Sequence, residues 1–192
     1  MKKNRLEAFS DGVLAIIITI MVLELEAPEE TTMEALLPKL PIFISYVLSF
    51  IYVGIFWNNH HHLFQITEKV NSRILWANLH LLFWLSLIPF TTSWLGENHV
   101  EAAPLAFYGF NLLMSAVAFV FLQASIVKFH GKDFNLKTIL GFGIKEKLSL
   151  MLYFIGVVLA FFVPWLSVAC YFIVALIWVI PSKKIENNIS TF

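Results

Sequence analysis

Charged residues and cysteine are scarce in this sequence. Asp, Glu, Lys and Arg make up 14% of the 192 residues, and the formal net charge is zero. Soluble domains carry about 25% charged residues. The balanced charge argues against a nucleic-acid partner or an acidic substrate. The single cysteine, Cys170, cannot form an internal disulfide, a zinc cluster or a redox pair, so we interpret it as a small buried hydrophobic residue.

Sequence motifs of enzymes and metal sites are also missing. No serine stands in a nucleophile elbow, and no glycine-rich loop follows a strand pattern. We expect no enzymatic activity, no catalytic residue and no cofactor. The adjacent histidines His60, His61 and His62 point about 100° apart on a helix and have no metal-binding partner at helical spacing, so we expect no metal site. Proton sensing by these histidines or by His80 stays open.

Apolar residues dominate the sequence instead. They make up 59% of the chain, and the mean hydropathy is +0.78. This composition predicts an all-α integral membrane protein with one domain over residues 1–192. The six expected transmembrane helices are 9–25, 42–64, 74–95, 105–129, 148–163 and 165–180. Pro164 separates the last two, which we interpret as a tight hairpin. We expect the first span to be retained, because no small-residue cleavage site precedes Glu24.

The basic residues indicate the orientation of these spans. Of the 13 Lys and Arg residues, all but Lys39 fall at the N-terminus, in the second-to-third and fourth-to-fifth connections, or in the C-terminal tail. The acidic residues Glu26, Glu29, Glu30, Glu34, Glu97 and Glu101 gather on the other side. Cytoplasmic loops are enriched in Lys and Arg. We therefore predict a multi-pass protein of the cell membrane with both termini in the cytoplasm.

Asp11 stands at the head of an apolar run, 13–23, that is short for a bilayer span. An ionisable residue in or beside a span is costly unless it is paired. One interpretation is a helix cap, with Ser10 or Asp11 accepting first-turn amides. The other is a polar network with another span, in which Asn78 and His80 are the available partners. Arg5 is about 240° around the helix from Asp11 and would not pair with it along one face.

The same span carries a row of apolar residues. Ile16, Ile20 and Leu23 fall at i, i+4 and i+7, and Phe9 and Gly12 extend the row towards the N-terminus. Such a row is typical of ordinary helix packing. It is also what a hydrophobic pore constriction requires, because an apolar ring can gate by dewetting. The spacing alone leaves both interpretations open.

The pattern Arg5-x-x-x-Phe9-Ser10-Asp11, followed by Ala15-Ile16 and Thr19, resembles the signature of the transmembrane protein 175 potassium channels of lysosomes and prokaryotes. The six-span layout fits a prokaryotic member with one six-helix unit. The resemblance implies a homotetramer in membrane lipid, with the first helix of each subunit lining a central pore. It places the narrowest ring at Ile16, further pore residues at Ile20 and Leu23, and Thr19 on the adjoining face.

The resemblance also implies that Arg5, Ser10 and Asp11 hold the pore helix through a polar network, to which we assign Asn78 and His80. Glu24 and Glu26 would stand at the extracellular mouth and concentrate cations there. The permeant ions would be monovalent cations, K+ above all. Since the chain has no TVGYG-like filter, we expect only a modest preference for K+ over Na+.

Two other functions stay open from the residues. One is a proton-coupled or proton-conducting carrier that uses Asp11 and the membrane histidines. The other is a membrane scaffold that transports nothing, for which a change at Ile16 would leave ion flux untouched.

Overall fold

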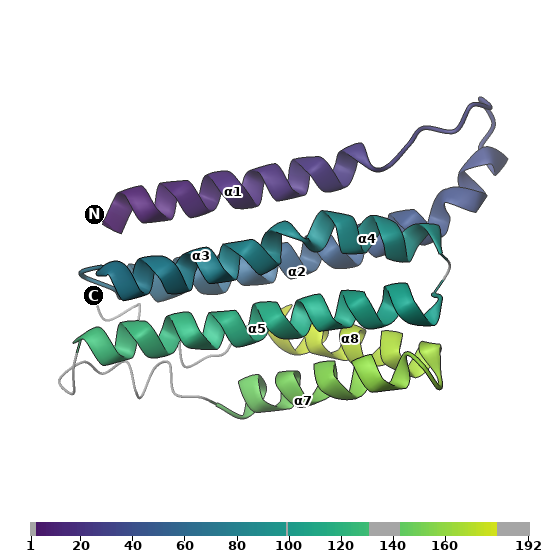
Figure 1. Cartoon of the computed structure of the whole chain (residues 1–192). Coiled ribbons are helices and arrows are strands. Elements are labelled where there is room, and N and C mark those ends of the chain that lie inside the picture. Colours follow the sequence, from purple (N-terminus) through teal and green to yellow (C-terminus); the bar gives the residue numbers. More distant parts are fainter. Residues whose placement is uncertain (1–2, 99, 131–142, 180–192) are drawn as a thin grey trace.

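A computed structural model describes residues 3–98, 100–130 and 143–179 of the chain, and within these ranges it is helical without any strand. The elements are α1 (Lys3–Leu23), the 3-10 helix η1 (Glu34–Lys39), α2 (Leu40–Gln65), α3 (Ser72–Ser86), α4 (Ile88–Glu97), α5 (Ala102–His130), α7 (Ile144–Leu159) and α8 (Pro164–Val179). They run side by side along one long axis (Figure 1). The predicted all-α class is confirmed for the described residues.

The first helix is longer than its apolar run. It begins at Lys3 rather than at Phe9 and ends at Leu23, which makes 21 residues and a length of about 30 Å. This matches the thickness of a bilayer's hydrocarbon core, about 30 Å. The helix therefore begins six residues before the expected span 9–25 and ends two residues before the end of that span, because the polar residues before Phe9 continue the helix.

Proline sets the other departures from six simple spans. The third predicted span, 74–95, is two helices that meet at Leu87, because Pro89 lacks the N–H that would continue α3. Pro164 begins α8, and the predicted hairpin of α7 and α8 is present. Among the described residues, four stretches are long and apolar enough to cross a membrane: Lys3–Leu23, Glu34–Gln65, Ser72–Glu97 and Ala102–His130. With the 16-residue helices α7 and α8, the chain is a multi-pass membrane protein.

The core of the bundle lies around α5, which packs against α3, α4 and α7. Buried tyrosines fill the space between α2, α5 and α8. Tyr52 Oη donates to the carbonyl oxygen of Tyr171 at 2.6 Å, and the Tyr171 ring lies against Gly109 and Gly156, where a Cβ would collide with it. Cys170 beside it is only partly buried.

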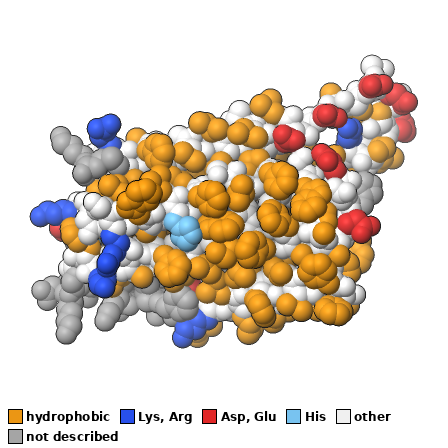
Figure 2. Space-filling view, in the orientation of Figure 1, with side chains coloured by type: hydrophobic (Ala, Val, Ile, Leu, Met, Phe, Trp, Pro, Cys, Tyr) orange, Lys and Arg blue, Asp and Glu red, His pale blue; other side chains and the backbone are white. Residues whose placement is uncertain are grey.

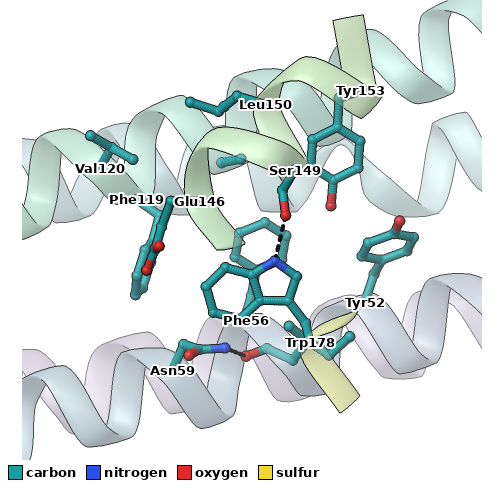
Figure 3. Close-up of a pocket in the computed structure, with 12 residues that line it drawn as sticks. Tyr52, Phe56, Asn59, Phe119, Val120, Glu146, Ser149, Leu150, Tyr153 and Trp178 are labelled. Carbon is teal, nitrogen blue, oxygen red and sulfur yellow. Dashed lines mark hydrogen bonds between the residues drawn. The ribbon is translucent and has the colours of Figure 1, made fainter. Parts of the chain in front are cut away.

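A small cavity of about 40 Å³ lies between α2, α5, α7 and α8 (Figure 3). Aromatic side chains, among them Phe56, Phe119 and Tyr153, line it together with aliphatic and polar ones. The Trp178 indole N–H donates to Ser149 Oγ at 2.8 Å and ties α8 to α7 there. No residue of α1 lines this cavity, which belongs to the interior of the bundle.

The helix α1 lies at the edge of this core. It packs on α2, α3 and α4, whereas α7 and α8 occupy the opposite side of the molecule (Figure 1). The two ends of the bundle differ in charge. Blue basic side chains gather at the end where α1 begins, and red acidic ones gather at the end where it stops (Figure 2). At the acidic end Lys39 Nζ lies 3.6 Å from Glu26 Oε2.

Candidate pore helix and its polar anchor

One face of α1 is buried against the rest of the chain. It consists of residues spaced three or four apart: Leu6, Ser10, Leu14, Ile17 and Met21. Each of these is at most 3% exposed. This spacing is that of a single helix face, so the inward rotation of α1 is fixed by ordinary apolar packing around one serine.

The opposite face of α1 is not covered by the rest of the chain. Phe9 is 50% exposed, Ile16 60%, Ile20 42% and Leu23 74%. Thr19 is also exposed, and its Oγ1 donates to the Ala15 carbonyl at 2.8 Å. The predicted row therefore faces away from the subunit's own bundle, and it is apolar along the length of the helix.

A buried hydrogen-bond chain joins α1 to α3 and α2. Asn78 Nδ2 donates to Ser10 Oγ at 3.0 Å, and Asn78 Oδ1 lies 2.8 Å from His60 Nε2. Ser10 Oγ donates in turn to the Leu6 carbonyl at 2.9 Å. Ser10 and Asn78 are fully buried and His60 is 3% exposed. A buried polar group without a hydrogen-bond partner costs free energy. These hydrogen bonds therefore favour one rotation of α1 against its neighbours.

Asp11 follows Ser10 directly but lies on an exposed part of α1. Its Oδ1 accepts a hydrogen bond from Trp57 Nε1 at 3.1 Å, and the Trp57 ring stacks on His61 with centroids 5.8 Å apart. The capping interpretation of Ser10 and Asp11 is wrong, because α1 begins at Lys3 and both residues lie two turns inside it. Asp11 instead ties α1 to α2.

His80 lies apart from the polar chain to which the sequence analysis assigned it. Its Nε2 accepts from Trp84 Nε1 at 3.0 Å, and its ring packs against Phe121. The reason is helical geometry, since His80 follows Asn78 by two residues and so points about 200° away from it on α3. Asn78 meets His60 instead.

Sequence reasoning missed His60 and Trp57 as partners of the motif. A signal was present for His60, because Tyr52, Phe56, His60 and Leu63 follow one another at helical spacing on the buried face of α2. The three adjacent histidines do point in different directions. His61 Nε2 lies 2.9 Å from Gln65 Nε2 on the exposed side, and no metal-binding group of three or more His, Cys, Asp or Glu occurs among the described residues.

The remaining predicted residues lie at the two ends of α1. Arg5 is exposed at its beginning. Glu24 and Glu26 are exposed just past its last residue, Leu23. Glu24 Oε2 lies 3.1 Å from Ser93 Oγ of α4. The two carboxylates thus stand at the acidic end of the bundle, next to the uncovered apolar row.

Known proteins with related sequences are channels rather than enzymes. A family model described as "Endosomal/lysosomal potassium channel TMEM175" matches residues 5–89. A protein of Chryseobacterium sp. (strain P1-3) named a potassium channel is 54% identical over 98% of this chain and 98% of its own length. A mouse protein named an endosomal/lysosomal proton channel is 30% identical over 65% of this chain but only 25% of its own length.

The fold is also similar to that of a known channel. A crystal structure of a lysosomal potassium-selective channel TMEM175 homologue from Chamaesiphon minutus superposes with a TM-score of 0.80 at 27% identity, covering 92% of this chain and 96% of the other. The family resemblance inferred from Arg5-x-x-x-Phe9-Ser10-Asp11 is confirmed. Related over nearly its whole length to one such channel in sequence and to another in fold, the chain belongs to the TMEM175 family of membrane channels.

Proposed function

We propose that this chain is one subunit of a homotetrameric cation channel with a modest preference for K+. The observation that carries the proposal is the uncovered row on α1, in which Ile16, Ile20 and Leu23 are 42–74% exposed while the opposite face is packed. A single chain has one such helix and cannot enclose a pore with it. Several copies of α1 around an axis would cover the row and form an apolar constriction.

The constriction would select ions by an apolar ring rather than by carbonyl ligands. A ring of Ile16 side chains would gate by dewetting and make an ion shed part of its hydration shell. Ile20 and Leu23 would continue the ring outwards, with Thr19 on the adjoining face. Because no carbonyl cage replaces the lost water, the expected preference for K+ over Na+ is modest.

The polar contacts of α1 would keep the ring at a fixed radius. The chain of Ser10, Asn78 and His60 holds one side of the helix, and the bond between Trp57 and Asp11 holds another. Together they oppose rotation of the row away from the axis. His80 has no place in this proposal.

Two motif residues act differently in the proposal. Arg5 is exposed at the beginning of α1, so we assign it to contacts between neighbouring subunits, whereas Phe9 continues the exposed row towards the N-terminus. The orientation follows from charge, with the basic end and both termini in the cytoplasm of the cell membrane. Glu24 and Glu26 then lie at the extracellular mouth, where a ring of carboxylates attracts monovalent cations.

The test is K+ flux from liposomes that contain the purified protein at symmetric pH. Ile16→Asn is expected to raise K+ flux and reduce the preference for K+ over Na+, because a polar ring admits hydrated ions. Ile44→Asn is the matched control, since Ile44 of α2 is 64% exposed, close to the 60% of Ile16, but lies outside the row. It should leave both quantities unchanged.

Other results would refute parts of the proposal. If both variants conduct like the parent, the pore row is misplaced. If folded, oligomeric parent protein conducts no K+, the chain is not a channel under these conditions and the scaffold function gains support.

A second permeant ion, the proton, is favoured by the names of the animal relatives, which are called proton channels. Proton flux driven by a pH gradient across the same liposomes tests it. A carrier that uses Asp11 and the histidines predicts loss of flux in Asp11→Asn and in His60→Gln. A pore lined by the apolar row predicts that proton flux responds to Ile16→Asn instead.

A further inference from the structure

A cavity of about 450 Å³ lies between α1 and α4 at the acidic end of the bundle. Ile20 of α1 and Glu24, the residue that follows α1, line one side of it, and Phe90, Ser93, Trp94 and Glu97 of α4 line the other. The volume falls within the range of pockets that hold small organic molecules, about 300–1,000 Å³. Nothing in the anchoring of α1 uses this cavity.

The apolar wall of the cavity is built for a flat or bulky group. Phe90 and Trp94, one turn apart on α4, stack with ring centroids 6.0 Å apart and an angle of 29° between their planes. Phe90 is 59% exposed and Ile20 is 42% exposed. Aromatic faces of this kind attract organic cations through the ring quadrupole.

The polar wall holds more negative charge than its own donors satisfy. Ser93 Oγ lies 3.1 Å from Glu24 Oε2 and 3.0 Å from Glu97 Oε1. A hydroxyl has one hydrogen, so it can donate to only one of the two carboxylates at a time. The other carboxylate oxygen then faces the hydroxyl oxygen without a proton between them.

No described basic residue neutralises this pair. Lys39 is the basic residue of the described chain at this end, and it is paired with Glu26 at 3.6 Å. Figure 2 shows the acidic side chains at this end bordering a broad apolar surface. The cavity therefore joins two exposed carboxylates, with which no described basic side chain forms an ion pair, to aromatic walls.

We propose that this cavity binds an organic ammonium ion that carries an apolar substituent. The charged head lies between Glu24 and Glu97, and the substituent packs on Phe90 and Trp94. A hydrated inorganic cation gains nothing from the aromatic wall, because it keeps its water. A neutral apolar molecule gains no charge attraction from the two carboxylates.

Binding at this cavity has a consequence for conduction. Ile20 lines the cavity and also belongs to the exposed row of α1, so an occupant touches the helix that we assign to the pore. Occupation from the acidic side should then alter K+ flux. This consequence rests on the proposed function, whereas the binding itself does not.

The test is equilibrium dialysis of benzyltrimethylammonium against the detergent-solubilised full chain. Glu97→Gln is expected to weaken binding about tenfold, and Phe90→Leu about two- to fivefold, since exposed cation–π contacts are modest. Glu101→Gln is the matched control, because Glu101 is an exposed carboxylate at the same end that does not line the cavity. The neutral isostere neopentylbenzene should bind more weakly, and Glu97→Gln should not change its binding.

Several results would overturn the proposal. Absence of binding to the parent protein does so, including the case in which a neighbouring subunit fills the cavity. So does equal binding to the parent and Glu97→Gln, or equal weakening by Glu101→Gln. In liposomes, externally added probe should reduce K+ flux through the parent but not through Glu97→Gln. Binding without any effect on flux would leave the site standing and argue against Ile20 as a pore residue.

Discussion

Replacement of Asn78 by leucine should lower the free energy of unfolding of the subunit. Leucine has the same γ-branched shape as asparagine but is larger, so the change removes hydrogen bonds, leaves no cavity and adds some overpacking to the site. Asn78 is fully buried and bridges Ser10 Oγ at 3.0 Å and His60 Nε2 at 2.8 Å. After the change Ser10 still donates to the Leu6 carbonyl, whereas His60 Nε2 has no partner left on α3.

The magnitude follows from these two losses. A hydrogen bond between membrane helices contributes on average about 0.6 kcal/mol. A buried polar group left without a partner costs about 1–3 kcal/mol. The loss of the Ser10 bond and the orphaned His60 together predict a decrease of about 2–4 kcal/mol in the free energy of unfolding.

The assay is equilibrium unfolding in mixed micelles, followed by circular dichroism at one fixed protein concentration, because the stability of an oligomer depends on concentration. Asn58→Leu is the control, since Asn58 is exposed on α2. A double-mutant cycle adds Ser10→Ala and measures the coupling between Ser10 and Asn78 directly. The second change should cost less in the Asn78→Leu background than in the parent.

One result would refute the reasoning. If Asn78→Leu and Asn58→Leu have the same free energy of unfolding, the buried hydrogen bonds of Asn78 do not stabilise the subunit. Apolar packing alone then holds α1. A coupling energy near zero, with both single variants destabilised, would mean that the two residues act independently.

Two further predictions concern packing and charge. Gly109→Ala should lower the free energy of unfolding by about 1–3 kcal/mol or more, because the added Cβ would collide with Tyr171. Gly54→Ala is the control and should be nearly neutral in the same assay, since the space at its Cβ is open. A stable Gly109→Ala protein would show that the tyrosine can move away. The double change Glu24→Gln and Glu26→Gln should reduce K+ flux roughly twofold to tenfold at about 10 mM salt and have little effect near 1 M, where the screening length falls to about 3 Å. A reduction that persists at high salt would exclude long-range attraction as its cause.

The sequence predicted the fold class and the family, but it did not predict some helix boundaries and hydrogen-bond partners. Hydropathy located each apolar segment, since lipid requires long apolar helices. It could not find the beginning of α1 at Lys3, because that end of the helix is polar. The break at Leu87 was missed as well, although Pro89 was visible in the sequence.

The polar contacts of α1 were predicted only in part from the sequence. The motif and its spacing identified Ser10 and Asp11, and composition offered Asn78 and His80 as partners. Which histidine meets Asn78 depends on how α2 and α3 are rotated and aligned, and neighbouring positions on a helix differ by about 100°. His60 and Trp57 lie about 50 residues along the chain from the motif and reach it only through this packing.

The sequence by itself determined that this protein is an all-α membrane protein of the TMEM175 family, because the apolar composition and a local motif need no tertiary contact to be recognised. Only the tertiary structure decided which face of α1 is buried, that His60 rather than His80 meets Asn78, and that Glu24 and Glu97 share one hydroxyl. These features join residues far apart in the chain, and their geometry is set by how helices pack, which residue spacing within one helix does not encode.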